Sequence, residues 1–409
     1  MFHKKESWKK SISLFLLSQT ITLLGSALVQ FAITWYITLE TGSGIMMTIS
    51  TVCGFLPAFF LSPFAGVWAD RYNRKMLIIF ADAFIAIATL GLFFSFFFGY
   101  DAIWLLFLIS IVRSIGNGIQ TPAVSAMIPQ LVPKEELSRI NGIYGSIQPV
   151  VSLGAPLLSG ILLASTGIRF VFLIDVITAV IGISLFFFFV KVPTHEKALQ
   201  KEKNSYFSDM GSGLMYIIKS KKLLILFFFC IAYFLFLAPA AMLTTLQVVR
   251  LFGEDVMKLT FVEVSFSVGM VLSGIFIAVK KNFSDKIRVL SISSIAFAFF
   301  AIGLGLSSDF SFYLVFMALC GTTVPFINTA ATVYLQEKTN EAFHGRIFGI
   351  LTMLSCGLLP LSMLAWGPLS DRVSISALLI VSGIAMLTFA VALFFNKTLS
   401  EKKHQMPEP

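Results

Sequence analysis

Four ionisable residues interrupt long apolar stretches of this 409-residue sequence: Asp82, Arg113, Asp175 and Glu263. A carboxylate in apolar surroundings can bind a proton or a cation, and an arginine there pairs with a carboxylate or controls its charge. A charge deep in a membrane costs at least ~2.5–3.5 kcal/mol on insertion scales, so each residue is a candidate for proton coupling or charge pairing.

The four positions predict different roles. Arg113 lies near the middle of its apolar stretch, so we expect it to pair with, or control, a carboxylate in a central cavity. Glu263 is expected a few residues inside the outer end of a helix, either as a proton carrier or cation-binding group, or as a surface residue. Asp82 is expected about two turns inside a cytoplasmic end, where coupling and pairing with nearby arginines are both open. Asp175 is expected near an outer end, in a structural role.

The composition identifies the medium around these charges. Hydrophobic residues make up 57% of the chain, charged residues only 12%, and there are 44 Phe. Soluble domains carry about 25% charged residues, so the sequence predicts a protein embedded in lipid. The four Cys form no CxxC pair, which gives no disulfide framework, zinc site or other metal site, and we expect all four to be small buried apolar residues within the spans. We expect no cofactor.

Apolar stretches long enough to cross a bilayer position the four charges. A helix of about 20 residues spans the hydrocarbon core. The sequence predicts an all-α membrane protein of twelve transmembrane helices in two six-helix bundles. The expected spans are 14–39, 45–68, 76–98, 102–124, 140–165, 170–190, 223–248, 261–280, 287–307, 310–334, 346–369 and 375–395.

The distribution of Lys and Arg predicts the orientation. With the N-terminus in the cytoplasm, 25 of the 30 basic residues fall on the inner side and four in outer loops. This asymmetry follows the positive-inside rule and places both termini in the cytoplasm. The net charge of +9 is therefore a topology signal, and we expect no nucleic-acid partner.

A polar stretch divides the chain. Residues 191–222 form the expected cytoplasmic linker between a first bundle, residues 1–190, and a second bundle with a short tail, residues 223–409. Within the linker, Ser208 and Asp209 followed by spaced apolar residues predict a short amphipathic helix at the membrane surface. The pentapeptides that begin at Arg139 and Arg346 are alike and open equivalent helices in the two halves, which suggests an internal repeat.

The loop after the second expected span resembles the signature loop of the major facilitator superfamily. Its sequence is Gly-Val-Trp-Ala-Asp-Arg-Tyr-Asn-Arg-Lys, with Gly66, Asp70, Arg71, Arg74 and Lys75 at the motif positions. Gly66 is expected to allow a close helix approach, and Asp70 to cap a helix or pair with an arginine. The resemblance implies a conformational switch, a latch on the cytoplasmic side that opens and closes.

Two further stretches are similar to motifs of the same superfamily. Arg113-Ser-Ile-Gly116 looks like its intramembrane arginine motif. The stretch containing Gly154, Pro156 and Gly160 resembles a degraded form of the motif associated with drug:proton antiporters. Ala155 interrupts the family's glycine-proline step, so a simple helix kink remains an alternative.

The whole chain looks like the macrolide-efflux branch of bacterial major facilitators. Thr121-Pro122-Ala123, Leu131-Val-Pro133, the segment from Glu263 to Gly269 and Val324-Pro325-Phe326 carry this resemblance. It implies a monomeric drug:proton antiporter in the bacterial cell membrane. Its partners would be a small lipophilic substrate such as a macrolide, the proton and the lipid bilayer. The residues expected to line an adaptable apolar cavity are Gln30, Phe31, Trp35, Gln120, Tyr233, Phe236 and Asn328.

Other functions lack their sequence features. There is no GxxxxGK[ST] phosphate loop for an ATP-driven pump and no HExxH pair for an intramembrane metalloprotease. We therefore expect a transporter and not an enzyme. A facilitator or symporter that imports a nutrient or metabolite remains the alternative, although the sequence offers few hydrogen-bonding groups for such a cavity.

Overall fold

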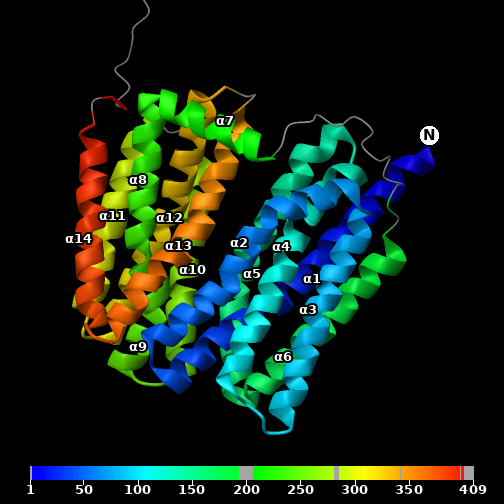
Figure 1. Ribbon diagram of the computed structural model, residues 1–409, viewed down its shortest axis with the longest axis horizontal. Coiled ribbons are helices and arrows are strands. Elements are labelled where there is room, and N and C mark those ends of the chain that lie inside the picture. Colours follow the sequence, from blue (N-terminus) through cyan, green and yellow to red (C-terminus); the bar gives the residue numbers. More distant parts are fainter. Residues whose placement is uncertain are drawn as a thin grey trace, which may run out of the picture. The chain divides into compact units, whose positions relative to one another are not determined.

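The computed structural model describes residues 2–190, 192, 206–280, 285–340, 343–396 and 398–399. Helices and short connections make up this described part, and twelve of the helices are long and apolar enough to cross a membrane (Figure 1). The expected all-α fold with twelve spans is confirmed. Most of residues 191–205, including Lys191, Lys197, Lys201 and Lys203 of the expected linker, lie outside the described residues.

The chain packs as two compact units, one of Met1–Lys203 with Glu254–Thr260 and one of Asn204–Gly253 with Phe261–Pro409. The helices of the first unit are α1 (Phe2–Thr41), α2 (Gly44–Arg71), α3 (Arg74–Phe97), α4 (Ile103–Leu131), α5 (Leu137–Thr166) and α6 (Ile168–Ser184), with a short 3₁₀ turn at Lys134–Glu136 and a π-helical turn at Leu185–Phe189.

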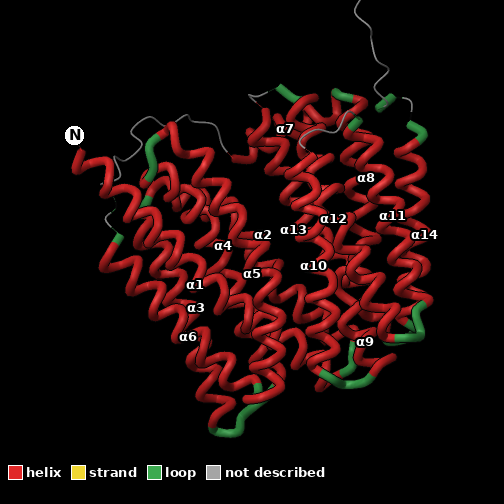
Figure 2. The backbone as a smooth tube through the Cα atoms, turned by 180° about the vertical axis from the view of Figure 1, so that it is seen from behind, coloured by secondary structure: helices red, strands yellow, loops and turns green. Residues whose placement is uncertain are grey.

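The remaining helices follow the linker region. They are α7 (Tyr206–Lys219), α8 (Lys221–Ala238), a π-helical turn (Pro239–Leu243), α9 (Thr244–Phe252), α10 (Val256–Lys280), α11 (Lys286–Leu306), α12 (Phe310–Lys338), α13 (His344–Ser370) and α14 (Ile375–Phe394). Figure 2 shows the same helices from behind, joined by short loops. The helix predicted around Ser208 is confirmed as α7.

The seventh span differs from the continuous helix expected over 223–248. Pro239 has no backbone N–H to donate to the preceding turn, and its ring crowds the carbonyl there. The chain widens into the π-helical turn at Pro239–Leu243 and continues as α9, so the span is helical throughout but not uniformly α. Several other helices are longer than expected; α4, for example, runs to Leu131 because two internal prolines are accommodated.

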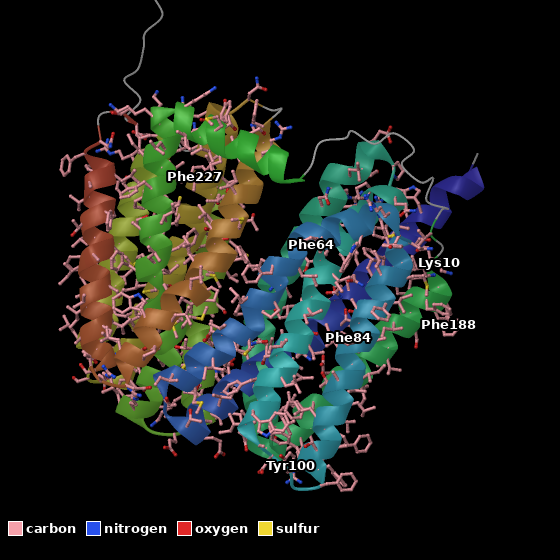
Figure 3. All side chains as sticks on the ribbon, in the orientation of Figure 1. Lys10, Phe64, Phe84, Tyr100, Phe188 and Phe227 are labelled. Atoms are coloured by element: carbon pink, nitrogen blue, oxygen red, sulfur yellow. The ribbon has the colours of Figure 1, made fainter. Side chains whose placement is uncertain are left out.

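Side chains of the first unit form two apolar clusters between its helices. One contains the fully buried Phe15, Ile78, Met127 and Phe186, from α1, α3, α4 and the π-helical turn after α6. The other joins α1, α3, α4, α5 and α6. Many large apolar side chains instead point outward, among them Phe64, Phe84 and Phe188, labelled in Figure 3. Outward phenylalanines on membrane-spanning helices are expected to meet lipid.

In the second unit, α10 and α12 cross with their backbones nearly touching. A Cβ at Gly269 would overlap the carbonyl oxygen of Ala318, and one at Gly321 would overlap that of Phe266. The first unit has a similar approach, where a Cβ at Gly118 would lie 3.1 Å from the Cα of Ala58. Small residues permit such approaches, which stabilise helix pairs in membranes through van der Waals contact.

We predict that Gly269→Ala or Gly321→Ala separates α10 from α12, because the new methyl group would meet backbone atoms that cannot rotate away. The expected result is a fall in apparent Tm of the detergent-purified protein of several degrees, corresponding to about 1–3 kcal/mol of overpacking. Gly274→Ala on α10 is the matched control, since a Cβ there meets nothing within 4 Å. Equal melting of the three variants would contradict the crossing.

Candidate functional site

An ion pair lies inside the first unit. The Arg113 Nη1 atom is 2.5 Å from the Asp175 Oδ2 atom, and both side chains are only 3% exposed. Arg113 comes from the middle of α4 and Asp175 from α6. The pair is thus enclosed by helices and shielded from water, where removing either partner would leave an uncompensated charge.

Two more groups complete the coordination of the Arg113 guanidinium. Nη1 also donates to the Thr89 hydroxyl on α3 at 3.0 Å, and Nη2 donates to the Ser26 carbonyl on α1 at 2.9 Å. Four helices therefore meet at one side chain. Gly25 makes room for this meeting, because a Cβ there would lie 3.0 Å from the Asp175 Oδ1 atom and would overlap Thr178.

A second buried carboxylate lies on the same two facing helices as this cluster. The Gln120 Nε2 atom donates to the Asp82 Oδ1 atom at 2.6 Å, and Asp82 is 7% exposed. Asp82 precedes Thr89 by seven residues on α3, and Gln120 follows Arg113 by seven on α4. At 1.5 Å per residue the two contacts are about 10 Å apart along the helices. The first contact involves the charged Arg113 guanidinium, and the second joins the Asp82 carboxylate to the neutral Gln120 amide.

The basic residues of the signature loop bind backbone carbonyl oxygens, of which those of Ala69, Phe187 and Val190 lie at helix ends and that of Ala126 five residues before the end of α4. Arg74 donates to the carbonyls of Ala69 and Ala126, each at 2.9 Å. Lys75 donates to the carbonyls of Phe187 and Val190, each at 2.8 Å. Carbonyls in the last turn of a helix lack intrahelical partners and carry negative partial charge, so cations stabilise them. The loop thereby ties together the ends of α2, α4 and α6.

The other loop residues have different environments. Arg71 is exposed, and the side chain of Asp70 lies outside the described part of the structure. Among the described residues, a Cβ at Gly66 would meet no atom within 4 Å, so they do not show the close helix approach expected there. The arginines considered as partners of Asp82 bind elsewhere or face outward, and Gln120 takes that place.

Glu263 is half-buried on α10, seven residues after the helix begins at Val256. This spacing places it about 10 Å along the helix. Within the described residues, its carboxylate makes no hydrogen bond or ion pair. It therefore differs from Asp82 and Asp175, whose oxygens have close donors.

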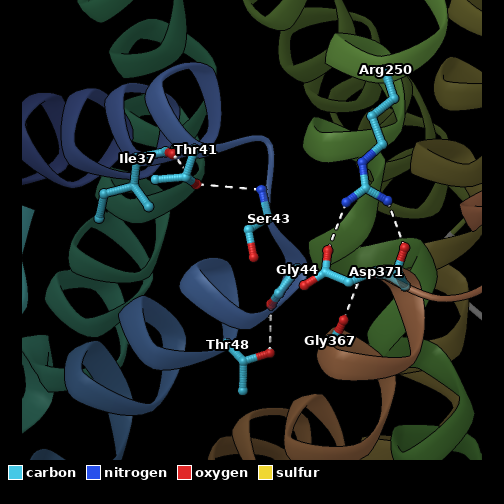
Figure 4. A network of polar contacts seen from close by, with 9 residues as sticks. Ile37, Thr41, Ser43, Gly44, Thr48, Arg250, Gly367 and Asp371 are labelled. Atoms are coloured by element: carbon cyan, nitrogen blue, oxygen red, sulfur yellow. Dashed lines mark hydrogen bonds and ion pairs between the residues drawn. The ribbon is translucent and has the colours of Figure 1, made fainter.

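Two polar contacts in the second unit were not predicted from the sequence. The Arg250 Nη2 atom lies 2.7 Å from the Asp371 Oδ1 atom, and Nη1 donates to the Ser370 carbonyl at 2.5 Å (Figure 4). Buried Gln247 donates to the Leu304 carbonyl and the Ser376 hydroxyl and accepts from Tyr313. One signal was available, because Gly367-Pro-Leu-Ser-Asp371-Arg372 repeats the Gly-x-x-x-Asp-Arg spacing that begins at Gly66.

The expected cavity residues lie in both units. In the first unit, Gln30 and Phe31 on α1 are half-buried, and Trp35 is 1% exposed and packs against Phe31 with ring centroids 5.6 Å apart. In the second unit, Tyr233 is buried against Phe229 and Phe297, Phe236 packs on Trp366 and Phe389, and Asn328 on α12 is exposed.

The antiporter-like stretch lies within one continuous helix. Pro156 and Gly160 are buried on α5, Gly154 is half-buried, and α5 runs unbroken from Leu137 to Thr166. No group of three potential metal ligands occurs among the described residues. Cys230 and Cys320 are buried as expected, whereas Cys356 is exposed and Cys53 half-buried, so the expectation of four buried cysteines is wrong for two of them.

Comparisons with known proteins agree with this fold. The family model of the Major Facilitator Superfamily matches residues 15–360. Macrolide efflux protein A of Streptococcus pyogenes is 27% identical over 95% of this chain and 96% of its own length. Macrolide efflux protein A of Enterococcus faecalis is 28% identical over 79% of this chain and 100% of its own length. The Staphyloferrin A transporter of Staphylococcus aureus is 21% identical over 95% of this chain and 96% of its own length.

Solved transporter structures share the architecture. A POT family transporter in complex with 5-aminolevulinic acid superimposes with a TM-score of 0.74 at 14% identity, covering 95% of this chain and 96% of the other. The nucleoside transporter NupG gives a TM-score of 0.66 at 16% identity, covering 95% of this chain and 99% of the other. At these identities the likeness shows the fold alone.

We predict that Arg113→Ala destabilises the protein strongly, because Asp175 would keep a buried charge without a partner. Removing one member of a buried pair costs about 3–5 kcal/mol, which should appear as a large fall in apparent Tm in detergent. Arg169→Ala, at an exposed arginine, is the control. The double variant Arg113→Gln/Asp175→Asn should melt above Arg113→Ala; a further fall would show that the two residues do not act as a pair.

Proposed function

This chain belongs to the major facilitator superfamily, whose model matches residues 15–360, and we propose that it exports lipophilic compounds, macrolides among them, in exchange for protons. The likeness to Macrolide efflux protein A over 95% of the chain carries this proposal. The apolar composition of the spans supports it, since an adaptable apolar cavity holds bulky substrates by contact area more than by fixed hydrogen bonds.

Asp82 is the group that we propose carries the coupling proton. Its neighbour Gln120 supplies a hydrogen bond but no positive charge. Asp175 has a full cation against it in Arg113, and neutralising the carboxylate would leave that buried cation without its partner. A buried carboxylate without a countercharge is the easier one to neutralise, so Asp82 exchanges protons while Arg113 and Asp175 hold the bundle together.

Glu263 is proposed to act on the substrate side. It is half-buried on a membrane-spanning helix, and no cation among the described residues pairs with it. A carboxylate in that setting attracts a positively charged group of a lipophilic substrate, or a second proton. Gln30, Phe31, Trp35, Gln120, Tyr233, Phe236 and Asn328 are the residues proposed to line the substrate path.

The proposed cycle is alternating access. The two bundles, residues 1–190 and 223–409 joined by the linker 191–222, open in turn to either side of the membrane. A proton from outside neutralises Asp82 and favours outward release of the substrate. Loss of the proton to the inside restores the binding form, and the loop containing Asp70, Arg74 and Lys75 changes its contacts between the two states.

One proton per cycle is energetically sufficient. A membrane potential of ~100 mV supplies about 2.3 kcal/mol for each charge moved. At ~1.4 kcal/mol per tenfold ratio, this supports a gradient of roughly 40- to 50-fold for a neutral substrate. If the exported molecule carries one positive charge, no net charge moves and only the pH difference drives export.

We predict that Asp82→Asn abolishes export, because an amide cannot exchange the proton. Cells that express the wild type should accumulate less radiolabelled macrolide than cells with an empty vector, and a protonophore should remove the difference. Cells with Asp82→Asn should accumulate as much macrolide as cells with the empty vector. Glu263→Gln should impair the export of cationic dyes more than that of neutral substrates. Glu254→Gln, at an exposed carboxylate, is the control and should export normally. Macrolide accumulation in wild-type cells that does not change with the protonophore would disprove proton coupling.

Proteoliposomes distinguish antiport from the alternative of nutrient symport. With a pH-sensitive dye in the lumen, substrate added outside should make the lumen more alkaline, because each substrate molecule that enters sends a proton out. A symporter would acidify the lumen. The sign does not depend on the orientation of the protein, and Asp82→Asn should give no change.

A further inference from the structure

Helix α7 (Tyr206–Lys219) lies across one end of the second unit, crosswise to the membrane-spanning helices (Figures 1 and 2). It ends one residue before α8, the first span of that unit, begins at Lys221. Ser220 separates the two helices and caps α8 by accepting a hydrogen bond from the Leu223 N–H. Large apolar side chains of α8 are exposed from Leu224 onward. α7 therefore lies where the apolar part of the bundle begins.

One face of α7 is bound to the start of α13. Ile217 is 2% exposed, and the Tyr216 ring stacks on Phe343 with centroids 4.5 Å apart. The Tyr216 hydroxyl also accepts a hydrogen bond from the Asn340 N–H at 3.3 Å. A Cβ at Gly213 would come within 3.0 Å of Arg346. These contacts fix which face of α7 packs on the unit and which face is left.

The remaining face is apolar and uncovered. Leu214, Met215 and Ile218 are 51%, 52% and 52% exposed. At 100° per residue these three side chains form one surface, adjacent to the packed face formed by Gly213, Tyr216 and Ile217. Three large apolar side chains at half exposure on a 14-residue helix are unfavourable in water, whereas the edge of the hydrocarbon layer would cover them.

The charge beside this surface selects the kind of lipid. Lys219, Lys221 and Lys222 are all exposed, and the sequence from Tyr206 to Leu224 contains a single acidic residue, Asp209. Basic residues next to an amphipathic helix attract anionic headgroups, and each lysine close to the surface favours binding by roughly fivefold.

We propose that α7 is a binding element for anionic phospholipid, with Leu214, Met215 and Ile218 in the acyl-chain boundary and Lys219, Lys221 and Lys222 on the headgroups. Because α7 packs against the start of α13, a lipid bound at this surface contacts the second unit. This lipid contact depends neither on the transported substrate nor on proton coupling.

Lipid binding by the purified full-length protein tests the charge. Native mass spectrometry should show retention of phosphatidylglycerol over phosphatidylcholine of the same acyl chains. Lys219→Gln/Lys221→Gln/Lys222→Gln should reduce that preference by roughly tenfold or more. Arg169→Gln/Lys258→Gln/Arg372→Gln removes the same charge from positions at or near the ends of other helices and should keep the preference. Equal retention by the two triple variants, or no preference in the wild type, would overturn the proposal.

A second measurement tests the apolar face without altering the lysines. Met215→Trp adds a tryptophan to the five present, and the added emission should be quenched by lipids brominated near the headgroup end of the acyl chain. Added emission that brominated lipid leaves unchanged but aqueous iodide quenches would place residue 215 in water and would exclude the lipid contact.

Discussion

The bilayer interior offers no water to hydrogen-bond a peptide group or a charge, and this constraint determines both the fold and the site. The spans within the described part are helical even at Pro239, where the chain widens instead of exposing carbonyls. The same rule governs Arg113, whose guanidinium finds a carboxylate, a hydroxyl and a carbonyl on three other helices. Because these partners lie on three different helices, the Arg113 side chain on α4 fixes four helices in one arrangement.

The two buried carboxylates that contact α4 differ in chemical character because their partners on that helix differ. Arg113 gives Asp175 a countercharge, whereas Gln120 gives Asp82 only a neutral donor. Neutralising Asp175 would leave the buried Arg113 charge without a partner, which is energetically costly. Neutralising Asp82 leaves no buried cation unpaired. The buried carboxylate of Asp175 on α6 is therefore suited to a structural role, and that of Asp82 on α3 to an exchangeable one.

The sequence predicted the elements more fully than the partners. Apolar length and the basic loops were enough for twelve spans and for α7, because both signals are local. The pairing of Arg113 with Asp175 depends on which faces of α4 and α6 meet, and a single sequence does not specify that register. The same holds for Asp82, for which the sequence offered nearby arginines as partners, whereas the structure gives it Gln120, two turns beyond Arg113. Arg250 is one of the four basic residues predicted in outer loops, and its partner Asp371 was not predicted because it lies 121 residues away.

Exposure separates the contacts that can change from those that cannot. Arg113 and Asp175 are 3% exposed, so breaking them would leave charges without water. Arg250 and Asp371 are 33% and 22% exposed, and Arg74 and Lys75 bind carbonyls at helix ends, where water can replace a lost partner. Rearrangement is therefore cheapest at the ends of the helices and most costly in the middle of the first unit. A transporter that changes shape around a fixed interior needs exchangeable contacts at the ends of its helices. The repeated Gly-x-x-x-Asp-Arg sequence lies at such ends, those of α2 and α13.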